Sequence, residues 1–163
     1  MNVHPQRHLN DLLKSFSTAM MITRSGDRSI HGRPMHIAEI SKDGELYFAT
    51  SLDSGKLRDI ENDPDVTLIF QGDSVFISLQ GTAHLSTDPD LIDRLWSESW
   101  RVWFPEGKDD ASLVILRIEP QDAEYWDNSG SEGISYAMTA LKAYIKGEQA
   151  VVTDAGQHAK VVL

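Results

Sequence analysis

The stretch "ELYFATSLDSGKLRDI", Glu45 to Ile60, runs from an apolar strand through a polar turn into a helix. This junction has two interpretations. In the first, Asp53 or Ser54 caps the helix and the neighbouring lysine points to solvent. In the second, free N–H groups at the helix start and nearby polar side chains bind a phosphate. The side chains available for that role are Thr50, Ser51, Ser54 and Lys56.

The segment "SLDSGK" has a Gly-Lys pair after a strand, as a nucleotide phosphate loop does, but it departs from that motif in two ways. The first glycine of the motif is missing, and Leu57 stands where a magnesium-binding serine or threonine belongs. The sequence therefore does not favour a nucleotide triphosphatase, and no GxGxxG fingerprint for a dinucleotide is present either.

Strand patterns dominate the sequence on both sides of this junction. The predicted strands are Thr18–Arg24, Ile30–Ile40, Glu45–Ser51, Val66–Gln71, Ser74–Ser86 and Ala111–Asp127. The first three are expected to pair sequentially as a meander, and Gly81 is expected to mark a bulge or a close backbone approach. Because helices are inserted between strands without strict alternation, we expect a mainly β antiparallel barrel with peripheral helices.

Helical spacing predicts helices over Pro5–Phe16, Ser54–Asn62, Asp88–Trp100 and Ile134–Ile145. The last of these precedes a tail whose end, residues 151–163, could add a strand. We expect a single domain over residues 1–163, with a core over 12–127 and a C-terminal helix and tail over 128–163.

Composition limits the classes of function. The net charge of −10 opposes binding to nucleic acid and to anionic membranes. The absence of cysteine excludes disulfides, thiolate nucleophiles and iron-sulfur clusters. No metal site is expected, because His4 and His8 lie one helical turn apart without a third ligand nearby. With neither a secretion signal nor an apolar span in the sequence, we expect a cytoplasmic protein.

The segment "GRPM", Gly32 to Met35, offers a second candidate for anion binding. Arg33 is the residue type that holds phosphate bidentately, and Pro34 suits an edge strand because it lacks a ladder donor. The alternative is an arginine at a hairpin end that extends into solvent. If the meander is correct, Arg33 and Lys56 face one anion.

Taken together, "RPM", "DGELYFATSLDSGKL", "DPDVTLIF", "ISLQGTAHLSTD", "LW…WFPEGKDD" and "AEYWD" resemble one known family. It is the general stress protein branch of the pyridoxamine 5'-phosphate oxidase-like FMN-binding split barrels. The resemblance implies a six-stranded antiparallel Greek-key barrel and a homodimer with FMN in the clefts between subunits. It also implies that Arg33, Lys56, Thr50 and Ser51 bind the FMN phosphate, and that the backbone at Pro34 and Met35 lies against the flavin.

The flat apolar part of such a site would need an aromatic side chain, for which Trp103 is one candidate. No catalytic residue is predicted. Three functions stay open at this point: a flavin-dependent oxidoreductase acting on an unidentified small molecule, a non-catalytic protein that binds or buffers FMN during stress, and a structural or interaction protein whose cofactor site is empty. In the first, the cofactor supplies the redox chemistry and the protein supplies binding.

Overall fold

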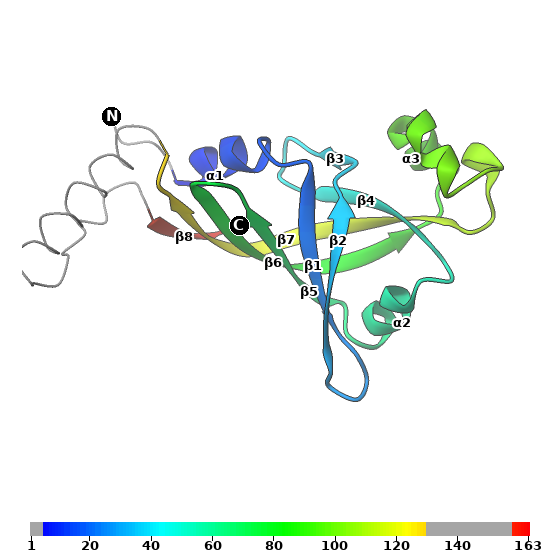
Figure 1. Cartoon of the computed structure of the whole chain (residues 1–163), viewed down its shortest axis with the longest axis horizontal. Coiled ribbons are helices and arrows are strands. Elements are labelled where there is room, and N and C mark those ends of the chain that lie inside the picture. The colour runs from blue at the N-terminus through cyan, green and yellow to red at the C-terminus, as the bar shows by residue number, and fades with distance from the viewer. Residues whose placement is uncertain (1–4, 130–157) are drawn as a thin grey trace, which may run out of the picture.

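A computed structural model describes residues 5–129 and 158–163 of the chain. Its centre is a strongly curled antiparallel sheet that forms half of a barrel (Figure 1). The strands follow the order β2-β1-β5-β6-β7-β4-β3, and β8 also pairs with β7. Their bounds are β1 Thr18–Arg24, β2 Ile30–His36, β3 Glu39–Ile40, β4 Leu46–Ser51, β5 Asp65–Gln71, β6 Val75–Ser86, β7 Leu113–Asp127 and β8 His158–Val162.

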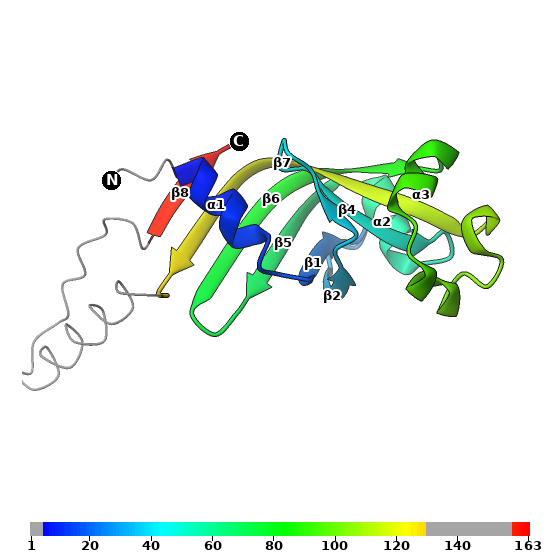
Figure 2. The same cartoon turned by 90° about the horizontal axis from the view of Figure 1, so that it is seen from above.

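Short helices lie around this sheet (Figure 2). They are α1 Pro5–Leu13, α2 Gly55–Asn62 and α3 Pro89–Leu95, with 3-10 turns η1 Glu98–Val102 and η2 Gly107–Asp109. Helix α1 lies beside β8, whereas α2 lies near the end of the β1–β2 hairpin and α3 lies at the far end of β7. No helix in the described part of the chain is long and apolar enough to span a membrane.

The sheet and α1 enclose the main core. Alternation of apolar and polar residues directs one face of each strand inward, as in β5, where Val66, Leu68 and Phe70 are buried. Helix α1 adds Leu9 and Leu13 to the same cluster. A second, smaller cluster lies under α3 and η1 and includes Ile92, Leu95, Trp100 and Phe104.

The predicted fold class is confirmed, but the number and pairing of strands differ from the expectation. The predicted strand over Ile30–Ile40 is divided into β2 and β3, and β8 is the strand expected in the tail. The expected meander forms in part. Strand β1 pairs with β2, and the two-residue β3 pairs with β4, but β2 itself does not pair with β4. On its other side β4 pairs with β7 along its whole length.

Two features of single residues are as predicted. Pro34 lies on β2, which forms one edge of the sheet, so its missing N–H breaks no ladder. Gly81 marks a register shift in the β6–β7 pair, opposite Pro120. A Cβ atom at Gly81 would lie 2.6 Å from the carbonyl oxygen of Glu119, so only glycine fits without a backbone shift.

The helix predictions need correction at their ends. Helix α1 ends at Leu13 rather than Phe16, and the helix after Asp88 ends at Leu95 and gives way to 3-10 turns. The helix predicted over Ile134–Ile145 lies outside the described residues.

Candidate anion-binding site

Arg33 is anchored at the edge of the sheet by its own hairpin. Arg33 lies opposite Met21 in the β1–β2 pair, and Thr23 follows Met21 by two residues on β1. Because residues two apart share a face of a strand, the Thr23 side chain lies on the same face as the Arg33 guanidinium, which reaches it. Nη1 of Arg33 donates to Oγ1 of Thr23 at 2.7 Å, and Nη2 donates to Oδ2 of Asp59 at 3.1 Å.

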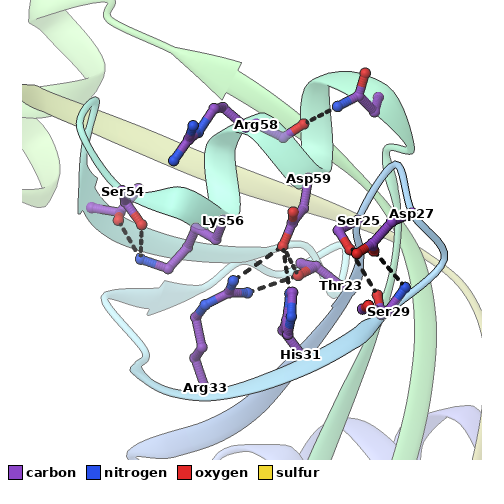
Figure 3. A network of polar contacts seen from close by, with 12 residues as sticks. Thr23, Ser25, Asp27, Ser29, His31, Arg33, Ser54, Lys56, Arg58 and Asp59 are labelled. Carbon is purple, nitrogen blue, oxygen red and sulfur yellow. Dashed lines mark hydrogen bonds and ion pairs between the residues drawn. The ribbon is translucent and has the colours of Figure 1, made fainter.

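Asp59 is the centre of this polar cluster (Figure 3). It projects from α2 and is only 7% exposed. Its Oδ2 accepts from Thr23 Oγ1 at 2.8 Å as well as from Arg33, and Nδ1 of His31 lies 3.4 Å away. Burial alone would raise the pKa of Asp59, but the hydrogen bonds from Thr23, Arg33 and His31 hold the pKa below its usual value. The carboxylate is therefore charged and pairs with Arg33.

Lys56 lies one turn earlier on the same helix, so it shares a helix face with Asp59. Its Nζ donates to Thr50 Oγ1 and to Ser54 Oγ, each at 2.7 Å. Burial lowers the pKa of Lys56, and the charge of Arg33 lowers it further. Figure 3 draws the side chains of Arg33 and Lys56 next to each other, so each positive charge acts on the other.

The Ser54 side chain does not cap α2. Ser54 occupies the N-cap position with an extended backbone, yet its side chain makes no capping hydrogen bond. The prediction that Asp53 or Ser54 caps the helix is wrong for the Ser54 side chain, because its oxygen accepts from Lys56 instead. Asp53 precedes the N-cap position, and its N–H donates to Ser51 Oγ at 3.3 Å.

These contacts leave donors for an anion. Thr50 and Ser54 use their oxygens to accept from Lys56, so each keeps its hydroxyl hydrogen to donate elsewhere. The Lys56 ammonium has three hydrogens and uses two of them in these contacts. The Arg33 guanidinium has five hydrogens and also uses two. We call this group, formed by Arg33, Thr50, Ser54 and Lys56, the phosphate seat. Chemically, it can bind and orient an anionic oxygen group.

The other predicted site residues lie outside the phosphate seat. The Ser51 hydroxyl accepts from the Asp53 N–H within the turn. Pro34 is exposed on the outer face of β2, and the Met35 side chain is buried in the core, so only its backbone could face a ligand. Trp103 follows η1 and is 73% exposed. Trp103 belongs to the segment that follows α3 and contains η1, and this segment lies apart from α2 (Figure 1).

Thr23, His31 and Asp59 were not predicted as site residues. One sequence signal points to Asp59: it falls beside Leu57 and Ile60 on the face of α2 that is buried. A carboxylate in such a position needs a cationic or hydrogen-bonding partner. Thr23 has no comparable signal, because its proximity to Arg33 follows from the hairpin register.

The fold and this site together define a class of protein, an antiparallel split barrel with a cationic, hydroxyl-rich seat beside the barrel edge. The family model described as "Pyridoxamine 5'-phosphate oxidase like" matches residues 4–151. The chain therefore belongs to the pyridoxamine 5'-phosphate oxidase-like family.

Similar proteins agree with the predicted general stress branch. General stress protein 26 of Bacillus subtilis is 37% identical over 82 residues, which are 47% of this chain and 58% of that protein. The match thus spans less than two thirds of the relative's length.

Two solved structures have similar folds. The first is the general stress FMN/FAD binding protein of Xanthomonas citri, 31% identical with a TM-score of 0.66, covering 76% of this chain and 89% of that chain. The second is a candidate general stress protein 26 of Jannaschia sp. CCS1, 22% identical with a TM-score of 0.73, covering 98% of both chains. The latter supports the fold alone.

Proposed function

We propose that the chain is a cytoplasmic, homodimeric protein that binds FMN at its subunit interface through the phosphate seat. The observation that carries this proposal is the arrangement of Lys56 between the Thr50 and Ser54 hydroxyls, next to Arg33. The Xanthomonas citri relative, described as an FMN/FAD binding protein, supports a flavin as the ligand.

The residues present fit the phosphate end of FMN. A phosphate monoester has three terminal oxygens that accept strong hydrogen bonds. The phosphate seat offers donors from two cations and two hydroxyls on one side of a turn. Riboflavin, which lacks the phosphate, would leave the Lys56 charge half-buried without a new partner, so the seat favours FMN.

The flavin ring would lie along the edge strand. The backbone at Pro34 and Met35 follows Arg33 directly, so a ring attached to a phosphate in the seat can rest against it. We propose that Trp103 of a second copy closes the slot, because Trp103 is largely exposed and the segment after α3 that carries it lies apart from α2 within one chain (Figure 1). A large exposed aromatic ring is a feature of binding surfaces.

The outer face of the sheet supports the homodimer. Large apolar side chains project from the outer face of β2, β1, β6 and β7 and stay partly exposed. They are Ile30, Met20, Phe76 and Trp126, with exposed fractions of 65%, 43%, 37% and 38%. The registers Met20–Ile69, Ile69–Ser78 and Phe76–Trp126 put them on one face, which we call the outer sheet face. Pro34 lies on this face opposite Met20, whereas the neighbouring Arg33 lies on the inner face opposite buried Met21. A second copy that docks on the outer sheet face and extends past the β2 edge would therefore meet the flavin site.

The bound FMN would supply redox chemistry, and we propose a flavin-dependent oxidoreductase that acts on a small molecule. A non-catalytic FMN-binding protein is the second candidate. One observation favours it: the one carboxylate of the cluster, Asp59, is engaged by Arg33 and His31, so it is less available as a general base.

The FMN proposal is tested with the double variant Arg33→Ala/Lys56→Ala. We expect its FMN affinity, measured by quenching of flavin fluorescence, to fall at least about a hundredfold, since two charge-assisted contacts are lost. The control Arg7→Ala/Lys42→Ala removes the same charge from exposed positions and should bind FMN as the parent does. An unchanged FMN affinity in the Arg33/Lys56 variant, with its fold intact by circular dichroism, would refute the site.

The two candidate functions separate in an anaerobic experiment. An oxidoreductase should lose its oxidised flavin absorbance when mixed with NADH or NADPH and regain it with an acceptor. A binding protein should stay oxidised over the same time.

A further inference from the structure

Asp59 is an unexpected residue in an anion-binding site, because it places a carboxylate directly behind one of the two cations. It is buried, and three donors from three different residues converge on its Oδ2. The Arg33 guanidinium at 3.1 Å and the Thr23 hydroxyl at 2.8 Å are the closest. A purely structural salt bridge could form anywhere on the surface, but this one uses the cation that faces the proposed ligand.

The carboxylate changes the charge that an incoming anion meets. Arg33 and Lys56 contribute two positive charges, and the charged Asp59 cancels one of them. Because Asp59 is buried, solvent screens its charge less than it would at the surface. An anion in the phosphate seat is therefore held less tightly than two unopposed cations would hold it.

We propose that Asp59 is a specificity-determining residue that anchors Arg33 and keeps the phosphate seat too weakly positive to retain free phosphate. Only a ligand that adds contacts beyond its phosphate group, such as the flavin ring of FMN, then binds tightly. This inference rests on the proposed function for the identity of the ligand, but its charge effect concerns any phosphate.

Two substitutions separate the charge of Asp59 from its role as an anchor. Asp59→Asn removes the charge while its side-chain oxygen can still accept from Arg33 or Thr23. Thr23→Val keeps the carboxylate but removes the hydroxyl that accepts from Arg33 and donates to Asp59. Glu61→Gln is the matched control, because Glu61 is an exposed acid two residues further along the same helix.

The probe is inorganic phosphate, titrated at constant ionic strength by calorimetry into each full-length protein without added flavin. For Asp59→Asn we expect the phosphate Kd to fall roughly tenfold or more, as expected for removal of a nearby buried charge. Glu61→Gln should change the phosphate Kd less than about twofold. Thr23→Val should leave the phosphate Kd unchanged or raise it. A phosphate Kd that is unchanged or higher in Asp59→Asn would overturn the proposal.

A second measurement covers loss of stability, because Arg33 loses its counter-ion in Asp59→Asn. If that variant is less stable, added phosphate should raise its Tm more than the Tm of the parent, since the anion replaces the missing charge. An equal rise in both would contradict the charge assignment. An equal gain in phosphate affinity in Thr23→Val and Asp59→Asn would also contradict the charge assignment. Loss of the anchor of Arg33, rather than loss of the Asp59 charge, would then explain the higher affinity.

The FMN Kd gives a further readout. Because the charge of Asp59 acts on any phosphate group in the seat, FMN should also bind Asp59→Asn more tightly than the parent, by about the factor found for phosphate. A phosphate Kd that falls while the FMN Kd stays unchanged would refute the role of Asp59 toward FMN. If no variant binds FMN but Asp59→Asn still gains phosphate affinity, the FMN proposal fails and the charge effect of Asp59 stands.

Discussion

At the scale of single residues, hydrogen bonds hold both cations of the cluster in place. Arg33 donates to the Thr23 hydroxyl and to the charged Asp59, and Lys56 donates to the Thr50 and Ser54 hydroxyls. Preorganised donors lose less conformational entropy when a ligand binds. The proposed anion binding therefore depends on these neighbours as well as on the two cations.

The titration of Lys56 gives a test of this arrangement. Because burial and Arg33 lower the pKa of Lys56, its ammonium loses the proton at a lower pH than the ordinary 10.5 of lysine. We expect affinity for FMN to fall as pH rises through this lowered pKa, by up to about tenfold per pH unit for a single proton.

Titration of FMN by fluorescence between pH 7 and the alkaline limit of folding measures the effect. Lys56→Gln is the control, and its weaker affinity should stay flat over the same range. A parallel fall in both proteins would assign the loss to another group.

At this scale, the sequence identifies the cations but not their partners. Arg33 and Lys56 were expected to face one anion, and the structure brings them together. The expected meander accounts for this only in part, because the β1–β2 and β3–β4 pairs form but β2 does not pair with β4. The two cations meet because α2 lies near the β1–β2 hairpin, a contact between segments distant in sequence. Asp59 was missed because the identity of its partners depends on that contact.

At the scale of elements, the strands were predictable because alternation of apolar and polar residues is a local property. Strand β1 has the predicted ends, and β5 begins one residue earlier than predicted. Strand pairing was not predictable in the same way. Nothing near β4 in the sequence indicates that it pairs with β7, more than 60 residues further along. The end of α3 was also missed, because 3-10 turns follow it without a change in apolar pattern.

The β6–β7 bulge gives a prediction at this scale. Gly81→Ala places a Cβ 2.6 Å from the Glu119 carbonyl oxygen and 2.9 Å from Ile118 Cγ2. Because backbone must move to relieve this contact, we expect the free energy of unfolding to drop by about 1–3 kcal/mol.

Denaturant unfolding monitored by tryptophan fluorescence measures the change. Gly26→Ala serves as the control, since a Cβ there meets no atom within 4 Å. Its stability should stay within about 0.5 kcal/mol of the parent. Equal stability of both variants would show that the bulge adjusts freely.

At the scale of the whole molecule, we propose that a second copy docked on the outer sheet face completes the ligand site beside the phosphate seat. Met20 lies on the outer sheet face and is 43% exposed. It pairs with Pro34 of the edge strand β2. Exposed apolar side chains that share one face are typical of interfaces.

We expect Met20→Glu to convert the dimer to a monomer and to weaken FMN binding with it, since a charge would be buried in the interface. Sedimentation velocity at micromolar concentration measures the first effect and flavin fluorescence the second. Leu85→Glu is the control, at a similarly exposed apolar position on β6. A Met20→Glu protein that stays dimeric would place the interface elsewhere.

We propose above all that the chain recognises FMN through its phosphate group. The most direct measurement is a comparison of FMN and riboflavin affinities for the parent protein by fluorescence quenching at pH 7. The two ligands differ only in the phosphate, which the seat would bind by charge-assisted hydrogen bonds. We predict that FMN binds at least about a hundredfold more tightly than riboflavin. Equal affinities, or no binding of either flavin, would contradict the account.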